Sequence, residues 1–118
     1  APLSSQEFGL AFEHFILCEF VRLKSYLHRK MSFSHYNTGA AEIDLVIQAP
    51  GVPDTFVEIK ATDRVTEGHF AALRALRKDY PEFRYVCLSR DPILRIEDGV
   101  EIIPWAEAIR DLLGMSAS

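Results

Sequence analysis

A segment in which charged and apolar residues alternate, residues 42–47, constrains the fold of this sequence most. Successive side chains of a β-strand point to opposite faces of the sheet, so residues two apart share a face. The alternation therefore predicts a strand with Glu42, Asp44 and Val46 on one face and three aliphatic residues on the other. Aspartate is disfavoured inside strands. Its position in the middle of this one indicates a functional or strained site.

A second alternating segment, residues 56–61, follows after a loop that holds two prolines and a glycine, residues 48–54. Such a short, turn-rich connection predicts that the two strands pair in antiparallel fashion. Glu58 and Lys60 then share one face of the second strand. We expect this face to lie on the same side of the sheet as Asp44, so that the three charged groups are close together.

Carboxylates that converge with one lysine suit metal-assisted phosphodiester chemistry. The carboxylates hold a hard divalent cation, and the lysine steadies the attacking water or the developing charge. The alternative is the solvent-facing side of an antiparallel sheet, on which Glu and Lys two apart are common.

Length and composition predict one globular domain spanning residues 1–118, with 48% hydrophobic and 25% charged residues. No apolar run reaches the ~20 residues that a membrane span needs, and no signal segment opens the chain. Cys18 and Cys87 lie in apolar segments, which predicts two buried, reduced thiols. We therefore expect a cytoplasmic protein with no membrane contact. Because residue 1 is alanine, we also expect a fragment of a longer protein.

The net charge of −4 argues against a nucleic-acid binder that relies on bulk electrostatics. Two local basic clusters lie near the ends of the first two predicted helices. They are favoured as solvated helix ends, where cations complement the helix dipole, over phosphate-binding faces. The clusters are Arg22, Lys24, His28, Arg29 and Lys30, and Arg74, Arg77 and Lys78.

Apolar spacing and turn residues predict an α/β domain with a mixed sheet. The first three strands form an antiparallel meander, and the fourth enters through a helical crossover, parallel to one of them. The expected order is a helix from Ser4 or Ser5 to about 28, strands over 31–37, 42–47 and 56–61, a helix over 66–80, a strand over 83–89, a turn at 98–99, a short strand over 100–103 and a helix over 105–113.

This order, with Asp44 on the second strand and Glu58-Ile59-Lys60 on the third, resembles the PD-(D/E)XK nuclease-like fold, of the restriction-endonuclease-like type. Asp44 matches the aspartate of the motif, and the Glu-x-Lys tripeptide matches its second part. Ile43 stands where the name of the motif has proline.

A closer resemblance covers nearly the whole chain. Four segments look like those of the uncharacterised domain found at the C-terminus of many prokaryotic AAA+-type ATPases. The resemblance implies that this chain is the nuclease-like tail of such an ATPase, whose ATPase domain is its partner. The segments are Gly9-Leu10-Ala11-Phe12-Glu13, residues 39–47, residues 57–61 and Ile102-Ile103-Pro104-Trp105.

The resemblance also implies the roles of the site residues. Asp44, Glu58 and the backbone carbonyl of Ile59 would hold Mg²⁺ or Mn²⁺, because all of these ligands are hard oxygens. Lys60 would orient or help to deprotonate the hydrolytic water. Glu13 matches the helix carboxylate that often completes such a site. From its position alone, at the edge of an apolar helical stripe, Glu13 faces either a cleft or the solvent.

Two functions remain open at this point. One is a metal-dependent nuclease module that hydrolyses DNA or RNA. The other is a catalytically silent module of the ATPase that binds DNA or a protein and regulates or assembles the complex. In a further alternative, the carboxylates are only surface charge.

Overall fold

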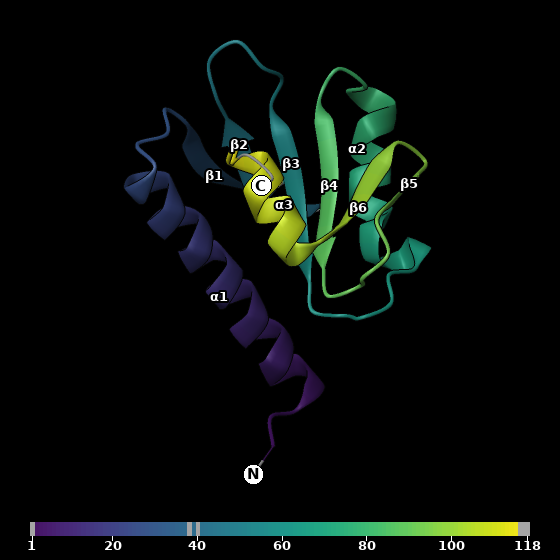
Figure 1. Cartoon of the computed structure of the whole chain (residues 1–118). Coiled ribbons are helices and arrows are strands. Elements are labelled where there is room, and N and C mark those ends of the chain that lie inside the picture. The colour runs from purple at the N-terminus through teal and green to yellow at the C-terminus, as the bar shows by residue number, and fades with distance from the viewer. Residues whose placement is uncertain (1, 38, 40, 116–118) are drawn as a thin grey trace.

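The computed structural model describes residues 2–37, 39 and 41–115. They form a six-stranded mixed sheet with helices on both faces (Figure 1). The predicted α/β class is confirmed. The elements are α1 (Ser5–Tyr26), β1 (Ser32–Asn37), β2 (Glu42–Gln48), β3 (Thr55–Lys60), the 3-10 helix η1 (Glu67–Phe70), α2 (Ala71–Asp79), β4 (Arg84–Ser89), β5 (Arg95–Glu97), β6 (Val100–Pro104) and α3 (Trp105–Leu112).

The strands lie in the order β1-β2-β3-β4-β6-β5. β1, β2 and β3 form the predicted antiparallel meander. β4 is parallel to β3, as predicted for a strand that enters through a helical crossover. β6 is parallel to β4, and β5 is antiparallel to β6 at the edge of the sheet.

The edge strand β5 is absent from the predicted order. It pairs with β6 across the predicted turn, in which Asp98 has a φ of 51° and Gly99 a φ of 77°. Two successive positive φ angles are typical of the tight turn that joins hairpin strands, and Asp-Gly is a favoured sequence for it. The turn thus contained the signal for a strand on both of its sides. β5 has only three residues, which are too few to show an alternation of apolar and polar side chains along the strand.

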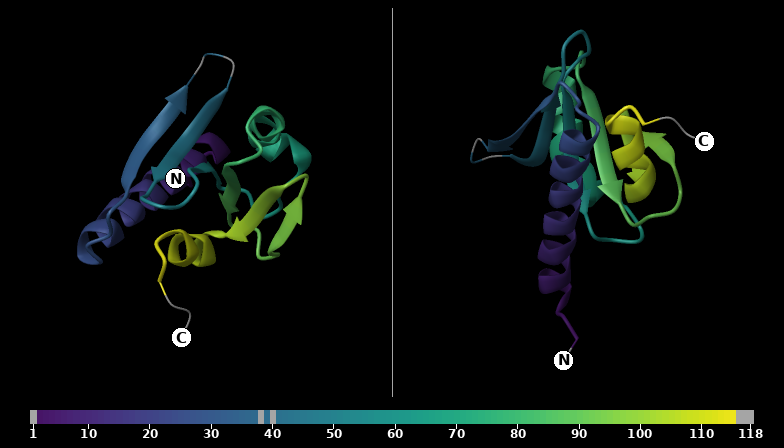
Figure 2. Two further views of the ribbon diagram at one scale, coloured as in Figure 1. Left: turned by 90° about the horizontal axis from the view of Figure 1, so that it is seen from above. Right: turned by 60° about the vertical axis from the view of Figure 1, so that its left-hand side comes forward.

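Two apolar cores flank the sheet, one on each face. The apolar stripe of α1, formed by Phe12, Ile16 and Phe20, packs with α3 against one face. The other face packs against α2, with Phe70 and Leu73 at its centre. Figure 2 shows α1 and α3 on one side of the sheet and α2 on the other.

The ends of α1 are fixed by local hydrogen bonds. Ser4 caps the N-terminus in a capping box with Glu7, as the sequence indicates. At the C-terminus, His28 has a φ of 54° and the Arg29 N–H donates to the Lys24 carbonyl at 3.1 Å. This is a Schellman ending, here with histidine at the position that glycine usually takes.

One residue of the basic cluster at the end of α1, Arg29, has a structural role rather than a purely solvated one. The guanidinium of Arg29 donates from Nε to the Leu113 carbonyl at 2.7 Å and from Nη2 to the Gly114 carbonyl at 3.2 Å. These carbonyls lie just beyond α3 and have no helical partner, so Arg29 caps that helix and ties it to the end of α1.

Two expectations about the helices need correction. Residues 66–80 do not form one helix, because the segment opens with η1 and continues as α2. Cys18 is exposed and only Cys87 is buried, and both thiols are free. Cys18 lies two residues after Ile16, which is about 200° around the helix and on the opposite side from the core. Among the described residues, no helix is long and apolar enough to cross a membrane.

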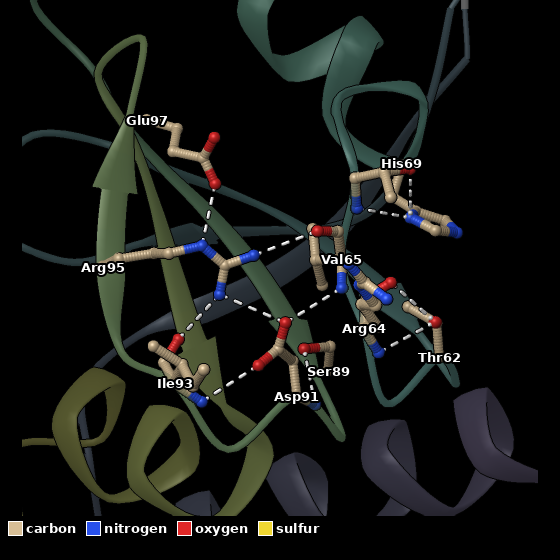
Figure 3. Close-up of polar contacts among 10 residues, drawn as sticks. Thr62, Arg64, Val65, His69, Ser89, Asp91, Ile93, Arg95 and Glu97 are labelled. Carbon is tan, nitrogen blue, oxygen red and sulfur yellow. Dashed lines mark hydrogen bonds and ion pairs between the residues drawn. The ribbon is translucent and has the colours of Figure 1, made fainter.

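A buried aspartate joins the loops that follow β3 and β4 (Figure 3). Asp91 accepts hydrogen bonds from the N–H groups of Val65 and Ile93, each at 2.9 Å. Arg95 pairs with the same carboxylate at 3.1 Å and donates to the Val65 carbonyl at 3.0 Å. These contacts fix the shape of the chain at the end of the sheet where the third strand terminates.

Candidate functional site

A β-bulge at Asp44 and Leu45 shapes the second strand. These two residues stand opposite one residue of β1, His35. The partners on either side of the bulge are Ser34↔Val46 and Tyr36↔Ile43. Bulges re-aim side chains and are common next to active sites.

Because of the bulge, the predicted faces of β2 are wrong in part. Ile43 and Val46 both pack on the α2 side, whereas Leu45 packs on the side of α1 and α3. Simple alternation had placed Ile43 with Leu45, and Val46 with Asp44. The uninterrupted apolar run from Leu45 to Ile47 was the available sign in the sequence that the pattern of charged and apolar residues changes after Asp44.

The carboxylate of Asp44 stands at the point where β2 and β3 separate. The described register between these strands runs from Ile47↔Thr55 to Leu45↔Val57. Beyond it, Oδ2 of Asp44 accepts a hydrogen bond of 2.8 Å from the backbone N–H of Ile59. The side chain thus takes the place of a strand partner, and this holds its carboxylate between the two strands.

Glu13 reaches the same point from α1. Its side chain lies beside that of Asp44, and burial together with the charge of Asp44 raises its pKa. The interaction between these two side chains raises the pKa of Glu13 and lowers that of Asp44. The pKa of Asp44 is nevertheless raised overall, mainly because the group is buried. The structure therefore brings Glu13 to the predicted site, where it is half-buried.

Glu58 is almost completely buried, with 6% of its surface exposed. Burial raises its pKa from 4.5 to about 7, and the charges of Asp44 and Glu42 add to the effect. Its strand partner on β4 is Cys87, whose pKa is raised to about 12, chiefly by burial and secondarily by Glu58. A thiol of this kind is inert as a nucleophile at neutral pH.

Lys60 supplies the positive charge of the site. It is the last residue of β3, two residues after Glu58, and it is partly exposed. Its charge lowers the pKa of Glu58 and of Asp44 and so favours their ionised forms. The predicted set of Glu13, Asp44, Glu58 and Lys60 is therefore electrostatically connected.

Glu42 is a further residue of the site, which was not predicted from the sequence. It is exposed at the start of β2, and its charge raises the pKa of Glu13, Asp44 and Glu58. Its position two residues before Asp44 was the signal that could have included it. The site thus holds four carboxyl groups and one lysine.

The donor chemistry of the site fits a hard divalent cation, because every side-chain oxygen comes from a carboxyl group. Burial and mutual repulsion raise the pKa of three of these groups, and a cation would relieve both effects. Within the described part of the chain, no three or more His, Cys, Asp or Glu side chains are grouped as metal ligands. Glu13 approaches from the α1 side, whereas the alternation of β3 turns Glu58 to the α2 side. The Ile59 carbonyl as a ligand remains a prediction.

The fold and the site define an α/β domain with a cluster of carboxyl groups and a lysine where its second and third strands separate. The chain belongs to the family described as a domain of unknown function, DUF4143, whose model matches residues 8–108. All five residues of the site lie within the matched range. No curated protein matches the chain.

Proposed function

We propose that this chain is a divalent-metal-dependent nuclease module that hydrolyses nucleic-acid phosphodiesters. The observation that carries the proposal is the placement of Asp44. Its carboxylate is fixed by the Ile59 N–H between two strands, and Glu13 lies beside it. The charge of Lys60 lowers the pKa of Asp44, and the charge of Asp44 raises the pKa of Glu58. Perturbed titratable groups gathered in this way are typical of catalytic sites.

Asp44 and Glu58 would hold Mg²⁺ or Mn²⁺, with the Ile59 carbonyl as a third ligand. The ion would supply Lewis-acid polarisation of the phosphodiester. Lys60 would orient the attacking water, and its charge favours the ionised carboxylates that a cation requires. The pKa of Glu13 is raised by burial and by the charge of Asp44, and a bound cation would favour its ionised form.

The restriction-endonuclease-like type of the fold is part of this proposal. It is supported by the antiparallel meander, the parallel entry of β4 and the position of the Glu-x-Lys tripeptide on β3. We further propose that the module belongs to a longer cytoplasmic ATPase of a prokaryote, with the ATPase domain as its partner. This part rests on the sequence resemblance alone.

A second candidate is a catalytically silent module that binds DNA or regulates the ATPase. It is favoured by the separation of Glu13 and Glu58 on different faces, and by the lack of grouped metal ligands among the described residues. On this account, the carboxyl groups contribute charge to a binding surface without a bound cation.

Cleavage of supercoiled plasmid and of single-stranded oligonucleotides in Mn²⁺ and Mg²⁺ distinguishes the two functions. Lys60→Ala is compared with the parent and with Lys78→Ala, which removes an exposed lysine from α2. The nuclease account predicts metal-dependent cleavage by the parent and by Lys78→Ala, and its loss in Lys60→Ala. Equal cleavage by all three proteins, or none by the parent, would reject it.

A further inference from the structure

The first turns of α1 extend past the end of the sheet (Figures 1 and 2). Gly9 lies in this part, one turn before Glu13 and seven residues before the buried Ile16, so it lies on the side of the helix that faces the sheet. A Cβ atom built on Gly9 would nevertheless meet no atom within 4 Å. Open space therefore lies beside Gly9, one turn of α1 before Glu13.

Neither packing nor backbone conformation explains this glycine. Its φ lies outside the left-handed region, and the space next to it is empty. Glycine inside a helix is less stable than alanine. Glycine is the residue that permits the closest approach of another molecule to a backbone. The position therefore fits a ligand that passes close to α1.

Arg90 lies at the same end of the sheet. Lys60 and Ser89 are partners across β3 and β4, so Arg90 follows directly beside the end of β3. Its Nη1 donates to the Ala61 carbonyl at 3.2 Å, and its guanidinium lies 5.0 Å from the centre of the Phe8 ring. The ring and the carbonyl hold the guanidinium in place next to the first turns of α1.

Arg90 forms no ion pair with a carboxylate in the described part of the chain. Four other arginines do so, and the charge of each is balanced by a neighbouring carboxylate. The paired arginines are Arg22, Arg74, Arg84 and Arg95. An oriented guanidinium with free N–H groups is suited to bind a phosphate.

Exposed aromatic rings border this region. Phe8 and Phe15 are 39% and 46% exposed, and the ring of Phe15 stands edge-on to Trp105 at 5.6 Å. Unpaired bases stack on such rings, whereas the bases of a duplex are already stacked on one another. The surface therefore favours a single strand.

We propose that a single strand of nucleic acid passes α1 at Gly9, with Arg90 binding one of its phosphates, so that the strand lies beside Glu13. This inference rests on the proposed function, because it names the form of the substrate of the same site. Gly9 and Arg90 act as positioning residues, and neither takes part in the chemical step.

The test is the affinity for a labelled single-stranded DNA oligonucleotide, measured by anisotropy in Ca²⁺ over a series of NaCl concentrations. Arg90→Gln is expected to raise the dissociation constant about tenfold and to reduce the slope of log K against log salt by about 0.7, the value for one phosphate contact on a single strand. Gly9→Ala is expected to raise the dissociation constant about tenfold while raising the melting temperature. A defect that accompanies a more stable fold is not a folding defect.

Matched controls come from the other side of the molecule. Arg77→Gln removes an exposed arginine from α2, and Gly68→Ala fills another glycine position with open space around it. Both are expected to bind like the parent. Trp105, the single tryptophan, provides a second readout, because a bound strand should quench its fluorescence.

The inference would be overturned if Arg90→Gln kept the affinity and salt slope of the parent and Gly9→Ala kept its affinity. This result would not bear on the nuclease function, which the plasmid-cleavage assay tests separately. Failure of the parent to bind the oligonucleotide would also overturn the inference. If Arg90→Gln and Gly9→Ala show the expected binding defects but the parent cleaves no nucleic acid, the proposed path of the strand is supported and the hydrolytic function is rejected.

Discussion

The carboxylate of Asp44 takes the place of a strand partner for Ile59, whose N–H donates to Oδ2 at 2.8 Å where β2 and β3 separate. The bulge that precedes this contact frees the side chain from the ordinary alternation of the strand. One residue thus closes the end of a strand pair and presents a carboxyl group to Glu13.

Asp44→Ala and Asp44→Asn should differ in stability. Alanine leaves the partly buried N–H of Ile59 without an acceptor, at a cost of about 1–3 kcal/mol. Asparagine keeps an oxygen that can accept this hydrogen bond and should cost less. Urea unfolding of both variants beside the parent measures the difference. Equal stability of the two variants would contradict the role of the hydrogen bond.

Glu58 should make the stability of the fold depend on pH. Its pKa rises from 4.5 to about 7 on folding, so between these values the folded state binds more protons than the unfolded state. The contribution of Glu58 is therefore fully present below about pH 4.5, falls as the pH rises towards about 7, and is lost above it. A shift of this size corresponds to about 3 kcal/mol.

Glu58→Gln removes this titration and should be more stable than the parent at about pH 8.5, with the two converging towards about pH 4.5. Urea unfolding of both proteins at several pH values provides the measurement. The difference between them isolates Glu58 from the other carboxyl groups. A difference that stays constant with pH would show that Glu58 titrates normally in the folded protein.

Asp91→Ala should destabilise the fold by about 3 kcal/mol. It leaves two backbone N–H groups and the partly buried guanidinium of Arg95 without their acceptor. Amide exchange at Val65 and Ile93 should accelerate. Glu97→Ala is the matched control, because it removes the more exposed partner of the same arginine. An equal loss of stability in the two variants would contradict the central position of Asp91.

The regular parts of the fold could be predicted from the sequence. The stripe of Phe12, Ile16 and Phe20 keeps its helical spacing, and residues 55–60 form a regular strand. For this reason the sequence places Glu58 and Lys60 on one face correctly. It also places Glu13 at the edge of the buried stripe, although it leaves open whether the side chain faces solvent.

The irregular parts could not be predicted in the same way. A bulge adds one residue to the period of two, so every side chain beyond it changes face, as Ile43 does relative to Leu45. The separation of Glu13 and Glu58 on different faces follows from the packing of α1 and α2. The position of Arg90 beside α1 depends on the pairing of β3 with β4. Local sequence patterns contain none of these relationships.

The most direct test of the account is calorimetric titration of the parent and of Asp44→Asn with Mn²⁺ at about pH 6, in two buffers that differ in their heat of ionisation. The account predicts one Mn²⁺ site in the parent, with release of protons, because the carboxyl groups with raised pKa values must ionise to bind a cation. Asp44→Asn should lose this binding. Absence of Mn²⁺ binding by the parent, or equal affinity in Asp44→Asn, would contradict the account.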